Sequence, residues 1–263
     1  MNRILLFLAA SVGVVFLVGP LVIVVGGSVS DSPFVQFPPE GFTLRWYAEM
    51  LKRDDFLASF VDSVIIAVLT TAAAAVMGTL AALGMQLFGC PRVREALATF
   101  VLSPLVLPTI ITGVALFQAV RWIDVDMPYA TLVVGHTLIT VPYVVRTVGA
   151  ALVGLDQSIL EAAESLGASP ARVILQVLVP AIAPAIFVSL IFVFIVSFDQ
   201  VTVSLFLSSP DVTPLPIRIY NYIEFAIDPM IAAVSTALIV FAYLLVMVLE
   251  KMIGLDRVFG KGN

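Results

Sequence analysis

Charged residues are scarce in this chain of 263 residues. Only 12% of the residues are charged and 61% are hydrophobic, whereas a soluble domain carries about 25% charged residues. A soluble globule could not hide that much apolar surface, because its exterior must be covered with water-compatible groups. The composition therefore excludes a cytosolic enzyme and a disordered protein, and the net charge of −5 argues against a nucleic-acid partner.

The chain also lacks three features that would direct the interpretation elsewhere. Its one cysteine, Cys90, permits no intrachain disulfide, so the redox compartment cannot be inferred from it. The prolines and glycines are dispersed, so no low-complexity linker divides the chain. No G-x-x-x-x-G-K-[ST] phosphate loop occurs, so the chain cannot bind ATP through that motif.

Long apolar stretches are abundant instead. A helix needs ~20 apolar residues to cross a bilayer core of ~30 Å, and six stretches qualify. We therefore predict an all-α integral membrane protein, a single transmembrane domain over 1–263. Its predicted spans cover 4–29, 60–88, 96–120, 129–152, 182–207 and 230–249. Pro104 and Pro108 interrupt the third span. The first stretch exceeds the ~7–15 apolar residues of a signal peptide, so we expect it to stay uncleaved.

Six spans place both chain ends on one side of the membrane. If that side is the cytoplasm, eight Lys and Arg residues lie at inner positions and five at outer ones, in agreement with the positive-inside rule. Most acidic residues lie on the outer side, where they would attract cations or simply keep the rim soluble. In the outer loop, residues 42–51 include Trp46 and Tyr47 and suit a helix at the membrane interface.

Small residues recur every four positions in the second span, at Ala74, Gly78 and Ala82. Rows of this kind let helix backbones approach closely in a membrane. We interpret this row as a packing surface.

The segment between the fourth and fifth spans predicts two short helices. Asp156 would cap the first helix, or Ser158 would do so in a capping box. Gly167 would end it, because glycine readily adopts positive φ. Ser169 would cap the second helix, which would stop before Pro180.

The first of these helices is amphipathic and too short to span the membrane. Its expected apolar stripe consists of Leu155, Ile159, Ala162, Ala163 and Leu166. A helix lying on lipid would carry lysines on its polar face, and this face has none. The pattern therefore favours docking against a protein.

The same loop, residues 154–180, resembles the EAA loop of ABC importer permeases. The resemblance is carried by Glu161-Ala162-Ala163, then Gly167, and then Val177 and Val179-Pro180. The family has Ile and Leu where this chain has the two valines, and both changes keep an apolar branched side chain. Segments 41–47, 103–108, 197–206 and 213–220 further resemble the spermidine/putrescine-type permeases.

This resemblance implies a permease subunit of a binding-protein-dependent importer in the bacterial inner membrane. The chain itself would bind no cofactor and catalyse no reaction. ATP and Mg would be used by separate ATPase subunits, expected in two copies. A second permease, expected to be a different chain, would complete the pore, and an extracytoplasmic binding protein would deliver the solute. The loop would be the coupling helix, with the ATPase contacted by Glu161, Ala162, Ala163, Gly167, Ser169 and Arg172.

The resemblance favours a polyamine as the solute. Related permeases carry opines, 4-aminobutyrate or aminoethylphosphonate, and more distant ones carry oxyanions. A secondary transporter or channel would need ion-coupling charges within the spans and would not need the EAA-like loop. An intramembrane protease would need a second intramembrane aspartate, or a serine motif within the bilayer, and the sequence offers neither.

Ionisable residues inside the spans are candidates for the substrate path, because burying them in lipid costs a few kcal/mol. Asp199 lies in the predicted fifth span, which contains no Lys or Arg, and Thr202 would share its helical face. His136 lies in the fourth span and Asp62 at the outer end of the second. Structural alternatives are a hydrogen-bonded His136, an interfacial Asp62, and an Asp199 that pairs with His136 or with a partner permease. No metal site is predicted.

Overall fold

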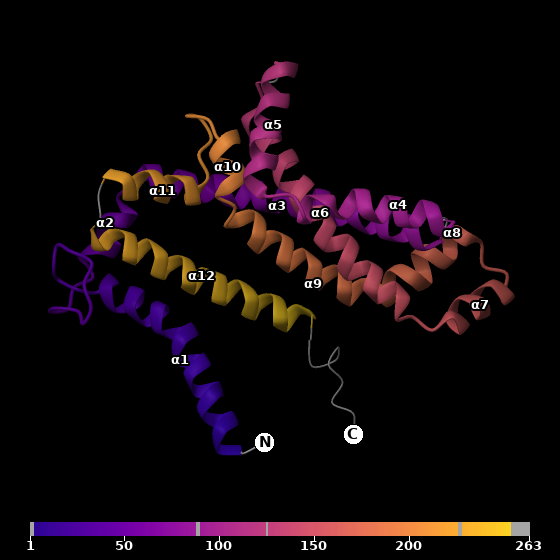
Figure 1. Ribbon diagram of the computed structural model, residues 1–263, viewed down its shortest axis with the longest axis horizontal. Helices are drawn as coiled ribbons and strands as arrows, with labels where there is room; N and C mark the ends of the chain where they lie inside the picture. The colour runs from indigo at the N-terminus through magenta and orange to yellow at the C-terminus, as the bar shows by residue number, and fades with distance from the viewer. Residues whose placement is uncertain (1–2, 88–89, 125, 226–227, 254–263) are drawn as a thin grey trace. The chain divides into compact units, whose positions relative to one another are not determined.

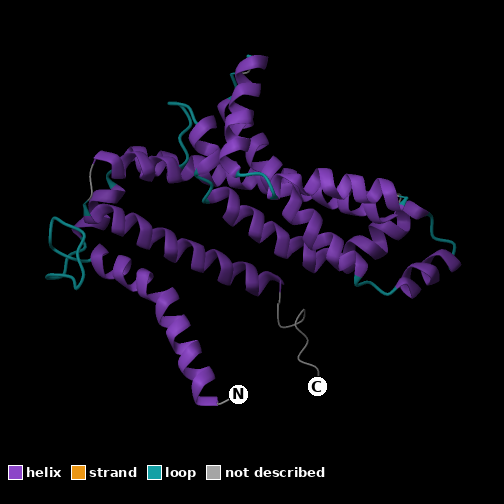
Figure 2. Ribbon diagram, viewed as in Figure 1, coloured by secondary structure: helices purple, strands orange, loops and turns teal. Residues whose placement is uncertain are grey.

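The computed structural model describes residues 3–87, 90–124, 126–225 and 228–253. Within these ranges every regular element is a helix and no strand occurs (Figure 2). The all-α prediction is therefore confirmed. Phe88, the predicted end of the second span, lies outside the described residues. So do Arg257 and Lys261, two of the eight Lys and Arg residues counted above at inner positions.

Twelve α-helices follow one another along the described chain (Figure 1). They are α1 (Arg3–Ser28), α2 (Arg45–Leu51), α3 (Asp54–Leu87), α4 (Pro91–Leu102), α5 (Thr109–Ile123), α6 (Pro128–Val153), α7 (Gln157–Ser165), α8 (Pro170–Val173), α9 (Val179–Phe198), α10 (Thr202–Leu207), α11 (Leu215–Phe225) and α12 (Pro229–Ile253). A 3-10 turn, η1 (Ser103–Leu105), follows α4, and a π-helical turn, η2 (Ile174–Leu178), joins α8 to α9.

Five helices in the described ranges are long and apolar enough to cross a bilayer, and a bent pair would make a sixth. The bent pair is the predicted third span, whose halves, Pro91–Leu105 and Thr109–Ile123, meet at 97°. Pro104 and Pro108 lie at the bend. Neither proline has an N–H to continue the helical hydrogen bonds, so the interruption follows from the sequence.

The chain forms two compact units, residues 1–59 with 218–245, and residues 60–217 with 246–263. The first unit contains α1 and the loop that follows it. The Trp46 indole donates to the Ser30 carbonyl at 2.8 Å, and the Tyr47 hydroxyl lies 2.7 Å from that of Ser28. The helix expected over 42–51 forms over the shorter range of α2, and its two aromatic residues bind it to the end of α1 and the start of the loop.

A second polar network in this unit joins the start of α3 to α11. The Arg53 guanidinium donates to both Asp55 carboxylate oxygens, at 2.9 and 3.0 Å, and lies 5.4 Å from the Tyr222 ring. The Tyr222 hydroxyl donates to Asp228 at 2.6 Å. Burial and this hydrogen bond raise the pKa of Tyr222 to about 12, so the phenol keeps its proton at neutral pH.

The second unit has its core where α3, α6 and α9 meet. The small-residue row of α3 faces α6: Ala74 and Ala82 are buried, and a Cβ built on Gly78 would lie 2.5 Å from the Cβ of Val144. The packing role predicted for this row is therefore confirmed. A second buried cluster joins α3 and α6 to α10 and the segment after it, through Ile66, Leu132, Ile139, Val203, Leu207 and Val212.

Candidate functional site

The loop between α6 and α9 begins as the sequence predicts. The Asp156 carboxylate accepts a hydrogen bond from the Ser158 amide at 2.9 Å and caps α7, and this bond holds the pKa of Asp156 below its usual value. Gly167 follows α7 with φ +81°, and its amide donates to the Glu164 carbonyl at 2.8 Å. A β-carbon penalises that backbone conformation, so glycine suits the corner.

The apolar stripe of α7 differs from the one we expected. Leu155 and Leu160 pack against the core of the second unit, whereas Ile159 is exposed and Leu166 is 89% exposed. The expected stripe passed through Ile159 and left Leu160 out, because helical spacing alone does not say which neighbour faces the core. Ala162 and Glu161 are exposed as well, so α7 presents apolar side chains that nothing in the described part of the chain covers.

The second loop helix does not stop before Pro180, which corrects our prediction. A single helix runs from Pro170 to Phe198, through α8, η2 and α9. Pro180 has no N–H to donate to the preceding turn, and the chain widens into the π turn η2 just before it. Ser169 and Arg172, both exposed, thus lie at the start of a rod that continues into the predicted fifth span.

The far end of this rod also corrects the prediction. The fifth span was expected to be continuous over 182–207, but α9 ends at Phe198 and α10 begins at Thr202. Asp199 therefore lies at the end of a helix and not within one. The helical face that Asp199 was expected to share with Thr202 does not exist, because that expectation assumed an unbroken helix. Asp199 is exposed, and no described residue donates a hydrogen bond to its carboxylate or pairs with it.

His136 lies deep inside the second unit and is 1% exposed. Its Nδ1 atom lies 2.9 Å from the Ser197 hydroxyl and its Nε2 atom 2.9 Å from the Ser204 hydroxyl. The expected alternative of a pair between Asp199 and His136 is therefore wrong in this structure. The hydrogen-bonded histidine that was the structural alternative is what is observed. Sequence spacing could not indicate the two serines, because they lie 61 and 68 residues away.

Asp62 forms a separate cluster near the start of α6. Its carboxylate accepts from the Tyr129 hydroxyl at 2.5 Å and from the Thr213 amide at 3.3 Å. The neighbouring Ser63 hydroxyl accepts from the Leu215 amide at 2.8 Å. These bonds join α3 and α6 to the segment that leads into α11, so Asp62 has structural partners that Asp199 lacks.

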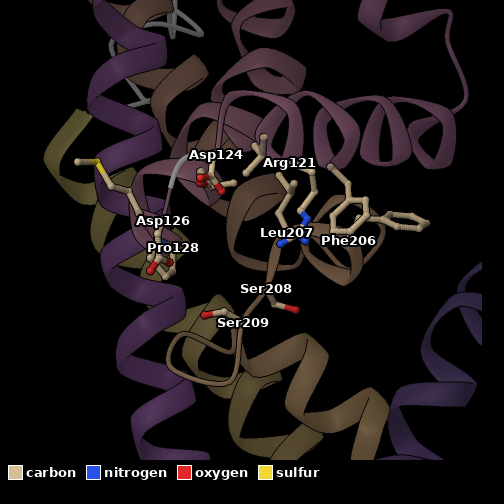
Figure 3. Close-up of a pocket in the computed structure, with 12 residues that line it drawn as sticks. Arg121, Asp124, Asp126, Pro128, Phe206, Leu207, Ser208 and Ser209 are labelled. Carbon is tan, nitrogen blue, oxygen red and sulfur yellow. The ribbon is translucent and has the colours of Figure 1, made fainter.

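A cavity of about 180 Å³ opens where α5 ends and α6 begins (Figure 3). Its wall includes Arg121, Asp124 and Asp126 on one side and Ser208 and Ser209, just after α10, on the other. Asp124 ends α5 in a left-handed conformation with φ 57°. The cavity therefore borders the ends of α5 and α10, and its wall carries charges of both signs.

Taken together, the described residues form a helical membrane domain with an exposed amphipathic helix at one end of the α8–η2–α9 rod and a carboxylate at the other. Residues 74–254 match the family of binding-protein-dependent transport system inner membrane components. The chain belongs to this family.

Curated relatives and solved structures agree with this assignment. The chain is 33% identical over 234 residues to the putrescine transport system permease protein PotI of Escherichia coli K12, covering 86% of this chain and 83% of the relative. It is 29% identical over 247 residues to the spermidine/putrescine permease PotC of the same organism, covering 93% and 90%. A bacterial alginate ABC transporter has the same fold, with a TM-score of 0.75 at 17% identity over 95% of this chain and 94% of that chain.

The chain is thus a multi-pass inner-membrane permease subunit of an ABC importer, and it is similar to polyamine permeases. It is a transport subunit and not an enzyme, and ATP hydrolysis belongs to a separate subunit. This assignment replaces the alternatives of a secondary transporter, a channel and a protease.

Proposed function

We propose that this chain forms half of the translocation pore of an ATP-driven importer for a small amine-bearing solute, and that the solute is a polyamine. The two permeases described above are named for putrescine and spermidine/putrescine transport, which supports the proposal. We propose further that residues 1–263 act as one permease domain with six membrane spans. The bent α4–α5 pair is one of these spans.

The observation that carries the proposal is the state of Asp199. The carboxylate is exposed at a helix end in a membrane domain, without an ion-pair partner among the described residues. A carboxylate at membrane depth is costly unless it is paired or wetted, and the break after α9 leaves polar backbone that must line protein or water rather than lipid. A passing ammonium group would supply the missing counter-charge. Thr202, the first residue of α10, would lie on the same path.

The test removes the negative charge of Asp199 and keeps the shape of its side chain. We expect Asp199→Asn to assemble normally in the full importer and to reduce radiolabelled putrescine uptake at least tenfold, whereas Asp199→Glu keeps a substantial part of it. Asp211→Asn is the matched control, because Asp211 is an exposed carboxylate in the loop after α10. Unchanged uptake by Asp199→Asn would contradict the charge role, and loss of assembly would point to a structural one.

We further propose that α7 docks into an ATPase subunit on the cytoplasmic side, through Glu161, Ala162, Ala163, Gly167, Ser169 and Arg172. The exposed Ile159 and Leu166 support a protein partner, because the polar face of α7 carries no lysine or arginine that would favour lipid. In this arrangement both chain ends are cytoplasmic. Two ATPase copies, a second permease of different sequence and an extracytoplasmic binding protein complete the importer.

Two substitutions test this docking. Gly167→Val places a β-carbon at φ +81°, and Ala163→Trp adds bulk where a close contact is expected. Both should insert and assemble yet lose substrate-stimulated ATPase activity. Gly154→Val is the control for the glycine, because Gly154 has φ −80° and tolerates a side chain. Normal stimulated activity in both Gly167→Val and Ala163→Trp would rule out the assignment.

A further inference from the structure

We propose that His136 is a positioning residue: its imidazole clamps α9 to α10 across the break at residues 199–201. The clamp thereby fixes where the carboxylate of Asp199 is presented. The clamp follows from the observed geometry, whereas its consequence for transport rests on the function proposed for Asp199.

The hydrogen bonds of His136 reach both sides of the break. Ser197 belongs to the last turn of α9, and Ser204 belongs to α10. Each serine hydroxyl lies 2.9 Å from a different ring nitrogen. All three side chains are buried. One side chain of α6 thus joins two helices that the backbone between them leaves separate.

A neutral imidazole suits this position chemically. It offers one N–H donor and one bare nitrogen acceptor, and a serine hydroxyl can either donate or accept. Either neutral tautomer therefore satisfies both contacts at the same time: one ring nitrogen donates to a serine hydroxyl, and the other accepts from the second serine hydroxyl. A ring without nitrogens would leave two buried hydroxyls without their partner, which proteins generally avoid.

The backbone alone holds the break weakly. The Gln200 amide donates back to the Ser197 carbonyl at 3.4 Å, at the long end of the hydrogen-bond range. The Val201 carbonyl accepts from the Leu205 amide at 2.8 Å, which already belongs to α10. The hydrogen bonding thus passes from one helix to the other between neighbouring residues, so contacts to the neighbouring helices α5 and α6 help to set the angle there.

The residue before the histidine brings α10 within reach. A Cβ built on Gly135 would lie 2.6 Å from Leu207 Cδ1 and 3.2 Å from Val203 Cγ1, both on α10. On α5, a Cβ on Gly113 would lie 2.6 Å from the Phe206 ring. Because neither glycine has a side chain, α10 packs tightly against both helices, and Ser204 comes close enough to bond the ring.

The experiment measures the break directly. In the assembled importer in nanodiscs, hydrogen–deuterium exchange of the amides of 199–205 should accelerate at least tenfold in His136→Phe. His136→Gln retains a donor and an acceptor and should restore most of the protection. Thr137→Val is the matched control, because the buried Thr137 hydroxyl has no hydrogen-bond partner among the described residues. Ser204→Ala removes one half of the clamp and serves if His136→Phe fails to assemble.

Uptake of radiolabelled putrescine then tests the consequence. We expect the maximal rate to fall at least fivefold in His136→Phe and to recover to within about twofold in His136→Gln. In an Asp199→Asn background, His136→Phe should lower uptake no further, because the charge that the clamp positions is already absent. A role in general stability would lower it again.

The outcomes separate the two proposals. Unchanged exchange in His136→Phe and Ser204→Ala would overturn the clamp, whatever Asp199 does. Accelerated exchange together with normal uptake by Asp199→Asn would support the clamp and contradict the role proposed for Asp199. A further loss of uptake in the double variant would overturn the positioning of Asp199.

Discussion

Helices α1 and α6 have the same length, 26 residues each, but opposite environments. The more apolar of the two, α1, has none of its most hydrophobic stretch buried against other described residues, whereas 56% of the most hydrophobic stretch of α6 is buried. In a soluble protein the order would be reversed. In a membrane, apolar side chains face lipid or another chain, whereas small and polar residues mark the contacts between helices.

Glycines make the comparison testable, because each one reports how close the next helix lies. The contacts with α6 include two glycines where an added Cβ would collide, Gly78 facing it from α3 and Gly135 on α6 itself. In α1, a Cβ on Gly13 or Gly19 would meet nothing within 4 Å. The same substitution, glycine to alanine, should therefore have very different effects in the two regions.

The largest effect is expected for Gly78→Ala. The new methyl group would lie 2.5 Å from the Cβ of Val144, an atom attached directly to the backbone of α6. That atom cannot move without moving the helix, so α3 and α6 must separate. Overpacking of this kind costs about 1–3 kcal/mol, and we expect a melting temperature several degrees lower in detergent. Gly84→Ala on the same helix, where nothing lies within 4 Å, is the control. Equal melting temperatures for the two variants would contradict the observed packing.

A smaller effect is expected for Gly135→Ala. Here the nearest atom, at 2.6 Å, is the terminal Cδ1 of Leu207, which can change rotamer, and the Val203 methyl group at 3.2 Å needs to shift by only a few tenths of an ångström. We expect a loss of about 1 kcal/mol, at the low end of overpacking costs. Gly149→Ala is the control on α6 itself. Thermal melting of the purified chain measures both. A loss larger than that of Gly78→Ala would reverse the proposed order.

Local signals in the sequence account for much of this fold. The apolar stretches predict the helices, the two prolines of the third span predict its bend, and Asp156 and Gly167 predict where α7 is capped and where the chain turns. Each of these features depends on residues within a few positions of one another. The apolar stretches cannot, however, distinguish α1 from α6 as exposed and buried, because that depends on which helices pack together.

The break between α9 and α10 could not be predicted in this way. Asp199, Gln200 and Val201 include neither glycine nor proline, so no local signal ends the helix there. The residues that contact α9 and α10 at the break are a histidine on α6 and two glycines that let α10 approach. They lie far from the break in the sequence, so no local pattern indicates them. Pro180 illustrates the opposite error, because the helix absorbs that proline as a π turn and continues. The candidate site was thus harder to predict from the sequence than the helices were, because it depends more on tertiary contacts.

The smallest effect is expected in α1, for Gly13→Ala and Gly19→Ala. Because no described residue lies within 4 Å of a Cβ added at either position, the substitutions should collide with no described part of the chain. Helix propensities measured in water favour alanine over glycine by about 0.8–1.0 kcal/mol, and no close contact opposes the new methyl group, so the melting temperature of the purified chain should stay constant or rise slightly. The same variants in the assembled importer sharpen the comparison. If α1 faces lipid there, assembly and melting are again unchanged. If either variant weakens the importer but leaves the isolated chain intact, that face of α1 packs closely against another subunit, and the apolarity of α1 marks a contact between chains rather than a surface for lipid.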